Sequence, residues 1–316
     1  MRYVGFDVGG TKCAVTVATV ENGRVTFEGK RAFPTPEAWQ EAVEQMFCAA
    51  EELLGDKRAD ACGFSCGSPL DAEKGIVLAP PNLPTWDHVP VTELAKARFG
   101  IPAFLENDAN ACALAEWRWG AGRGVDNMIF LTFGTGMGAG LILDGRLIRG
   151  ANGNAGEVGH MRLADFGPSG YGKEGSFEGF CSGGGVKQLG VTLGKRAVQS
   201  GMHPAYFTGD WEAVSAKTIA QAAQAGDETA REVYRLCGEK LGQALSVLVD
   251  VLNPDRIVIG SIYARSGELL EEAMQRVMRR ECLPQNLAVA KVVPAELGET
   301  LGDCAALCVA EYGLTR

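Results

Sequence analysis

Two glycine-rich turns of matching design constrain what this chain can fold into. The first is Asp7-Val8-Gly9-Gly10-Thr11-Lys12, and the second is Phe133-Gly134-Thr135-Gly136-Met137-Gly138. Each follows a short apolar run typical of a strand and leads into a second such run. Each second run ends at a hairpin-type dipeptide, Asn22-Gly23 or Asp144-Gly145. Two strand–glycine loop–strand units in one chain predict two related lobes.

Both turns are suited to binding phosphate. Backbone N–H groups converge on an anion only where the chain turns tightly and no side chain intervenes, which calls for glycine. Thr11 and Thr135 add hydroxyl donors. Neither turn has the Walker spacing or the Rossmann fingerprint, because a strand rather than a helix is expected after each. An ordinary tight turn would explain one loop alone, and finding two favours a phosphate chain held between them.

Composition excludes several classes of protein. The chain has 316 residues, enough for two domains, and its 46% hydrophobic and 22% charged content is typical of a globular protein. A net charge of −9 argues against a nucleic-acid partner. We see no apolar run that could span a bilayer and no signal peptide, so we expect a cytoplasmic protein. The ten cysteines include no C-x-x-C pair and are expected to be reduced, mostly buried thiols.

Strand and helix patterns alternate along the chain and predict an α/β fold. A three-stranded meander is expected over residues 2–33 and a largely irregular, glycine-rich segment over 150–185. Further strands are expected near 60–65, 102–106, 257–260 and 288–293, and from 127 into the second glycine loop. Helices are expected over 37–54, 91–99, from 107 or 108 to about 119, and over 215–252, 267–280 and 301–313.

Polar residues gather at Glu106-Asn107-Asp108-Ala109-Asn110, where a strand is expected to hand over to a helix. Helix capping is one interpretation, since Asn and Asp are preferred caps. One cap explains one residue, however, and four polar residues exceed what a cap needs. The alternative makes Asp108 a general base, kept ionised at the helix start and ready to accept a hydroxyl proton.

These motifs together resemble the ROK family (repressors, open reading frames and sugar kinases) in order and spacing. The resemblance also includes Ala155 to His160, Asn253 to Gly260, and Leu301-Gly302-Asp303, and it covers essentially the whole chain. It implies a two-domain, actin-like ATPase fold related to ribonuclease H, with an interdomain cleft. The implied lobes are residues 1–117 with 299–316, and residues 118–298. The implied activity is ATP-dependent phosphorylation of a hexose or N-acetylhexosamine, usually at the 6-hydroxyl.

The resemblance assigns roles residue by residue. Asp108 resembles the catalytic base, and Asp7 resembles a residue that holds Mg²⁺ through water. The matching sugar ligands are Asn82, Asn107, Glu157, His160 and Glu178. The matching nucleotide-binding residues are Gly9, Gly10, Thr11, Lys12, Gly134, Thr135, Gly136, Gly138 and Gly260.

The chain departs from the family pattern at two places. Most ROK kinases bind zinc through a histidine and three cysteines, but Ser169, Tyr171 and Ser176 stand at the cysteine positions here. Serine and tyrosine are poor zinc ligands, so no zinc is expected. Ser261 and Tyr263 follow Gly260 where consecutive glycines are commoner in the family, which leaves the nucleotide preference open.

The sugar also stays open. Glucose is the first candidate, N-acetylmannosamine and other N-acetylhexosamines the second, and fructose or allose the third. A sugar-sensing regulator is the alternative of another class, but family repressors carry a DNA-binding domain ahead of the first glycine motif. This chain starts six residues before Asp7 and is acidic, so a kinase is favoured. A homodimer is expected because it is common in the family.

Overall fold

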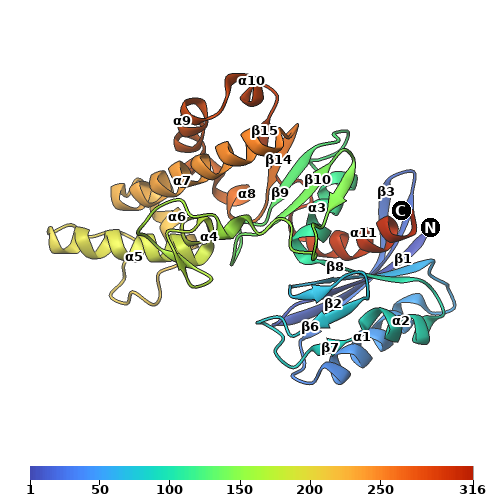
Figure 1. The fold of residues 1–316 in the computed structure, drawn as a ribbon. Helices are drawn as coiled ribbons and strands as arrows, with labels where there is room; N and C mark the ends of the chain where they lie inside the picture. The colour runs from blue at the N-terminus through green and yellow to red at the C-terminus, as the bar shows by residue number, and fades with distance from the viewer. Residues whose placement is uncertain (316) are drawn as a thin grey trace. The chain divides into compact units, whose positions relative to one another are not determined.

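The computed structural model describes residues 1–315, and its strands and helices alternate through most of the chain (Figure 1). The α/β prediction is therefore confirmed. The strands are β1 (Arg2–Val8), β2 (Lys12–Glu21), β3 (Arg24–Pro34), β4 (Ala61–Cys66), β5 (Leu70–Asp71), β6 (Ile76–Leu78), β7 (Asp87–Val89), β8 (Ala103–Asn107), β9 (Met128–Leu131), β10 (Ala139–Leu143), β11 (Arg146–Ile148), β12 (Ser169–Gly170), β13 (Lys173–Glu174), β14 (Arg256–Ile259) and β15 (Lys291–Pro294).

The helices follow in the same numbering. They are α1 (Trp39–Leu54), α2 (Val91–Phe99), α3 (Asp108–Trp119), α4 (Phe177–Phe180), α5 (Gly183–Gln199), α6 (Ala216–Gln224), α7 (Glu228–Leu252), α8 (Ile262–Ser266), α9 (Glu271–Glu281), α10 (Pro284–Leu287) and α11 (Leu301–Thr315), with 3-10 turns η1 (Val158–His160), η2 (Gly267–Leu269) and η3 (Gly298–Thr300).

The first sheet contains the predicted meander. Its strand order is β3-β2-β1-β4-β8, with β1, β2 and β3 antiparallel and β4 and β8 added parallel to β1. The β2–β3 turn has positive φ at both Asn22 (50°) and Gly23 (74°), as a type I′ hairpin requires. The hairpin predicted from this dipeptide is confirmed.

The two faces of β1 pack against different helices because successive side chains point to opposite faces. Val4, Phe6 and Val8 join the α1 side chains in one buried cluster, where the Phe6 ring stacks on Phe64 at 4.5 Å. On the opposite face, α11 packs against β1 and β4. A Cβ at Gly5 would lie 2.9 Å from the Leu307 amide nitrogen, so glycine permits this close approach.

The second sheet has the order β11-β10-β9-β14-β15. Strand β14 pairs in parallel with both β9 and β15, and all its residues after Arg256 are buried. Positive φ values at Asp144 (49°) and Gly145 (69°) close the β10–β11 hairpin. The second hairpin is therefore also confirmed.

Several expected elements differ in detail. The helical run predicted over 215–252 is two helices, because Gly226 adopts φ 103° and Asp227 caps the start of α7. The strand expected over 288–293 begins later, at Lys291. The segment 150–185 is more ordered than its composition suggested, since it holds η1, the β12–β13 hairpin and α4.

The chain divides into two compact units. Unit 1 comprises Met1–Asp126, Gly140–Ala155 and Glu296–Arg316, and unit 2 comprises Asn127–Ala139 and Gly156–Ala295. Within residues 1–315, no helix combines the length and the apolar character needed to cross a bilayer. All ten cysteines are free thiols, and only Cys48 is well exposed.

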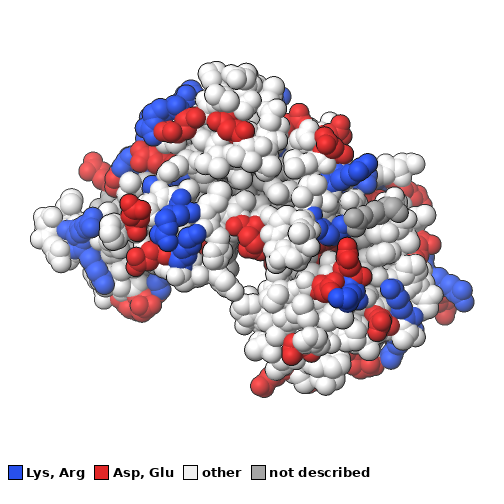
Figure 2. Space-filling view, viewed as in Figure 1, with Lys and Arg blue, Asp and Glu red and all other residues white. Residues whose placement is uncertain are grey.

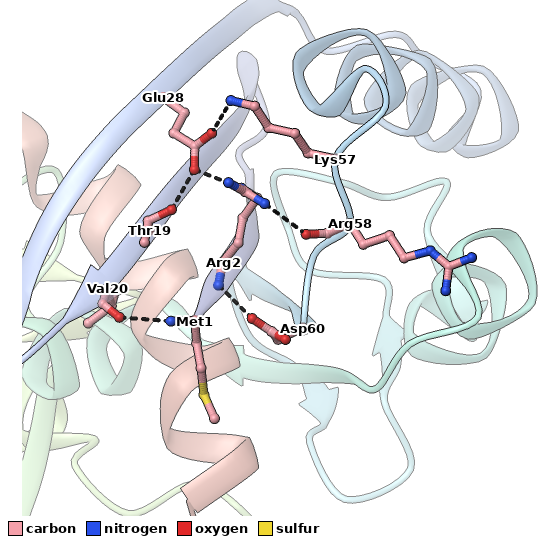
Figure 3. A network of polar contacts seen from close by, with 8 residues as sticks. All are labelled: Met1, Arg2, Thr19, Val20, Glu28, Lys57, Arg58 and Asp60. Carbon is pink, nitrogen blue, oxygen red and sulfur yellow. Dashed lines mark hydrogen bonds and ion pairs between the residues drawn. The ribbon is translucent and has the colours of Figure 1, made fainter.

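A polar network fastens the start of the chain to the first sheet (Figure 3). The Glu28 carboxylate accepts hydrogen bonds from Arg2 Nε (2.7 Å), Lys57 Nζ (2.8 Å) and the Thr19 hydroxyl. These three donors hold the pKa of Glu28 at about 2.

On the face of the molecule drawn in Figure 2, acidic and basic side chains are intermingled.

Candidate active site

The predicted junction between a strand and a helix is the junction between β8 and α3. Strand β8 ends at Asn107, and α3 begins at Asp108. The Asn107 Oδ1 accepts hydrogen bonds from the amides of Ala109 (2.9 Å) and Asn110 (3.3 Å), and its Nδ2 donates to the Ser68 hydroxyl (2.8 Å). Asn107 is therefore the helix cap.

Because Asn107 caps the helix, Asp108 is not needed for capping. Its Oδ1 accepts a hydrogen bond from the next amide, that of Ala109, at 2.8 Å. A carboxylate in the first helical turn is favoured electrostatically by the helix dipole. This position suits an ionised group that receives a proton.

A buried ion pair lies behind this turn. Glu106 is 2% exposed, and its carboxylate accepts from Arg149 Nε (2.7 Å) and Asn110 Nδ2 (3.0 Å). Arg149 Nη2 lies 2.6 Å from the same carboxylate. Because these bonds join the segment after β11 to the first turn of α3, Glu106 and Arg149 support the backbone that carries Asp108.

No role was predicted from the sequence for either member of this ion pair. Glu106 belongs to the polar motif at residues 106–110, but no local feature around Arg149 indicates that it pairs with a residue 43 positions away.

The first glycine loop lies between β1 and β2 and contacts the loop that holds Asn82. A Cβ at Gly10 would fall 2.5 Å from the Asn82 carbonyl oxygen, so only glycine fits there. The Gly9 amide donates to the Lys12 carbonyl (3.2 Å), and the Thr35 hydroxyl donates to the Gly9 carbonyl. Two groups that the sequence placed far apart, Gly10 and Asn82, are thus brought together.

Asp7 lies near the carboxyl groups of Asp303 and Asp108. Burial, and then the charges of Asp303 and Asp108, raise its pKa to about 6, while Lys12 and Lys30 act in the opposite direction. Asp303 is itself held by the Thr16 hydroxyl (3.1 Å) and by Lys30. Excess negative charge around Asp7 favours a cation beside it.

Backbone amides of the second glycine loop donate hydrogen bonds within the loop and to two nearby side chains. The Gly134 amide donates to the Gly136 carbonyl (3.0 Å), and the Gly138 amide donates to the Thr132 hydroxyl (2.9 Å). The Met137 amide donates to the Glu178 carboxylate at 3.0 Å. A predicted sugar ligand therefore contacts a predicted phosphate loop, which the sequence did not suggest.

The other two predicted sugar ligands of unit 2 flank η1. Glu157 precedes this turn and His160 ends it. The His160 ring meets the Tyr171 ring edge-on at 5.4 Å, and its carbonyl accepts a hydrogen bond from Lys173. Backbone hydrogen bonds from Leu163 and Ala164 to the Gly175 carbonyl close the same segment.

The residues at the family's zinc positions do not fit that metal. The Ser176 hydroxyl is buried and caps the Gly179 amide at 3.0 Å, while Tyr171 is 74% exposed. Neither side chain is a good zinc donor at neutral pH. Among the described residues, no three His, Cys, Asp or Glu side chains lie close enough together to hold a metal ion.

A cavity of about 760 Å³ opens beside the second glycine loop, entirely within unit 2. Gly134 and Thr135 line it, as do Ser261 and Ile262, which follow the predicted Gly260 strand end. Its lining includes Lys187, Lys217 and Arg265 but, within the described chain, no aspartate or glutamate. Lys187 also pairs with the Glu212 carboxylate at 3.0 Å, and the three cations together give the lining a chemistry suited to an anionic ligand.

Predicted site residues occur in both units. Unit 1 holds Asp7, the first glycine loop, Asn82, Asn107 and Asp108, and unit 2 holds the second glycine loop, Glu157, His160, Glu178 and Gly260.

Comparison with known proteins agrees with the sequence patterns. The model of the ROK family matches residues 3–311. A glucokinase of Thermotoga maritima is 30% identical over 304 residues, covering 96% of this chain and 95% of that protein. A xylose repressor of Caldicellulosiruptor bescii is 35% identical over 225 residues, covering 69% of this chain and 54% of the repressor.

Solved structures extend the likeness to the fold. A ROK family glucokinase from Streptomyces griseus, in complex with glucose and AMPPNP, has a TM-score of 0.79 and 30% identity, covering 99% of this chain and 100% of that one. The fold is the two-domain, actin-like ATPase fold that the sequence predicted. With a family match over nearly its whole length and glucokinases at 30% identity, the chain belongs to the ROK family.

Proposed function

We propose that this protein is an ATP-dependent sugar kinase that transfers the γ-phosphate of ATP to a hexose, at the 6-hydroxyl, with glucose as the first candidate. Its membership of the ROK family and its similarity to glucokinases along nearly the whole chain support this. The observation that carries the proposal is the position of Asp108, an acidic group at the start of α3 beyond the residue that caps the helix.

Asp108 is the general base of the proposed reaction. Its carboxylate accepts the proton of the sugar hydroxyl, whose oxygen attacks the γ-phosphorus. The bond from that phosphorus to the bridging oxygen breaks, and ADP leaves as the sugar phosphate forms. Such a transfer asks the protein mainly for positioning and charge neutralisation. Asn82, Asn107, Glu157, His160 and Glu178 are proposed to bind the sugar hydroxyls.

The two glycine loops are proposed to bind the nucleotide phosphates. The first loop contributes Gly9, Gly10, Thr11 and Lys12, the second contributes Gly134, Thr135, Gly136 and Gly138, and Gly260 lies at the adenosine site. Mg²⁺ typically keeps several waters and rests on one or two carboxylates and the substrate phosphates. Asp7 fits that role, and the metal would neutralise charge on the phosphate oxygens.

A coupled assay of ADP formation tests the proposal. Purified protein is given Mg·ATP and a panel of glucose, mannose, fructose, allose, N-acetylglucosamine and N-acetylmannosamine. Sugar-dependent ADP formation, highest with glucose, is expected. Highest turnover with N-acetylmannosamine or another N-acetylhexosamine would support the alternative substrate class.

A non-catalytic, sugar-sensing regulator is the second candidate, favoured by the likeness to a xylose repressor. Sugar binding by calorimetry with no ADP formation from any sugar would support it and contradict the kinase.

Other properties are proposed on the same grounds. We expect a cytoplasmic homodimer without zinc and without a nucleic-acid partner. Light scattering should then give twice the chain mass of 33.5 kDa. The proposed lobe bounds, residues 1–117 with 299–316 and 118–298, differ from the compact units over 118–126, 140–155 and 296–298.

A further inference from the structure

The turn after β14 has a backbone conformation that its sequence does not favour. The Tyr263 amide donates to the Gly260 carbonyl at 3.2 Å, so residues 260–263 form a hydrogen-bonded turn. Ser261, the first central residue, has φ 53° and ψ −107°. This is the region of a type II′ turn, where glycine dominates because a Cβ is strained. A serine at this position therefore destabilises the fold relative to glycine.

The Ser261 side chain makes contacts that glycine could not. Its Oγ accepts a hydrogen bond from Arg265 Nη2 at 3.2 Å. The same Oγ lies 3.5 Å from the position that a Cβ on Gly134 would occupy. The strained residue thus holds the Arg265 guanidinium close to the second glycine loop.

Arg265 and Ser261 both line the 760 Å³ cavity that contains Gly134 and Thr135. A guanidinium beside a phosphate-binding loop recognises phosphate by charge-assisted hydrogen bonds. Residues with strained backbone cluster at active sites and ligand sites. The position of this strain, the Ser261–Arg265 bond and the basic cavity lining all indicate the same ligand chemistry.

We propose that Arg265 contacts a phosphate of the bound nucleotide and that Ser261 is the positioning residue that holds Arg265 for this contact. The inference rests on the proposed kinase function and deepens it. It assigns part of the nucleotide affinity to two side chains in and after the turn that follows β14, beyond the backbone of the glycine loops.

The test compares Ser261→Gly and Arg265→Met with wild type by calorimetric titration of Mg·ADP and of adenosine, and by thermal unfolding. Arg265→Met should weaken ADP binding about tenfold or more, the usual value of a charged hydrogen bond, and change adenosine binding less than twofold. Ser261→Gly should weaken ADP binding about three- to tenfold and yet raise Tm by about 2–4 °C, because strain is relieved. The double variant should bind ADP no more weakly than Arg265→Met alone.

Two matched controls test whether losing any surface cation, or placing glycine at any positive-φ residue, is enough to weaken ADP binding. Lys195→Met removes an exposed cation of α5 that does not line the cavity, and Asn253→Gly removes a positive-φ residue (φ 44°) at the end of α7. Both should bind ADP like wild type.

The opposite outcomes are equally distinct. Unchanged ADP affinity in Arg265→Met, or an equal loss for adenosine and ADP, overturns the phosphate contact while leaving the kinase proposal intact. An ADP affinity unchanged in Ser261→Gly overturns the role of Ser261. A wild-type protein that neither binds ADP nor phosphorylates any sugar overturns both the kinase function and this inference.

Discussion

Asn107 and Asp108 are neighbours in sequence but have different roles, since Asn107 caps α3 and Asp108 is the proposed general base. Asn107 supplies the cap, and its side chain is fully engaged with the amides of α3 and with Ser68. The capping interpretation of this motif therefore holds for Asn107, and it leaves the carboxylate of Asp108 to be explained.

Substituting Asp108→Asn should lower kcat by about 10²–10⁴, the usual contribution of a positioned general base. Folding and sugar binding should persist, because the cap at Asn107 is untouched. Steady-state kinetics gives the first value, and the Tm shift induced by saturating glucose gives the second. A near-normal kcat would remove Asp108 from the proton transfer.

Glu157 and Glu178 should respond differently to substitution. Both are proposed sugar ligands, but only Glu178 also accepts the Met137 amide of the second glycine loop (3.0 Å). Glu157→Ala should raise the KM for sugar by roughly tenfold or more, with the KM for ATP unchanged. Glu178→Ala should raise both values, because it also releases the phosphate loop. Sugar KM values within twofold of wild type in both variants would contradict the proposed sugar site.

At the scale of elements, ring packing and hydrogen bonds link the parts of the segment from η1 to α4. The His160–Tyr171 ring contact, the Ser176 cap and the hydrogen bonds to the Gly175 carbonyl connect its parts. Two of the residues involved, Tyr171 and Ser176, stand at positions where the family pattern has zinc-binding cysteines.

Purified protein should contain well under one zinc per chain by elemental analysis. Treatment with a chelator should leave Tm unchanged, because the segment depends on packing and hydrogen bonds. One tightly bound zinc per chain, lost with a fall in Tm, would be the contrary result.

The Glu28 network predicts how the first sheet responds to acid (Figure 3). The pKa of Glu28 falls from its ordinary 4.5 to about 2 in the fold. The unfolded chain therefore binds more protons between these values, and stability falls as pH falls through the window. Above about pH 4.5 the contribution is fully present; screening at this partly exposed site limits it to about 1–2 kcal/mol.

Urea unfolding of Glu28→Gln at pH 7 should show that loss, and the difference from wild type should shrink toward pH 2.5. Glu52→Gln, at an exposed position of α1, is the matched control and should match wild type at both values. A Glu28→Gln difference that does not change with pH would show that packing rather than charge is responsible.

At the scale of the whole molecule, much of the organisation follows from local sequence. Both type I′ hairpins and the start of α3 depend on the backbone preferences of a few neighbouring residues. The break between α6 and α7 was missed although Gly226 and Asp227 carried a local signal for it. Family membership followed from the same short motifs, because their order along the chain is specific.

The side-chain contacts around the candidate site join residues that are far apart in the sequence. Glu106 with Arg149, Met137 with Glu178, and Gly10 with Asn82 join residues more than 40 positions apart. Whether such residues meet depends on strand order and on helix packing, which sequence patterns do not specify. The sequence by itself therefore determined the family, the α/β class and the positions of the two glycine-rich turns and of the polar motif at the start of α3. Only the tertiary structure decided which side chains support them, because a turn or a cap is a property of adjacent residues, whereas a buried ion pair is a property of the packing.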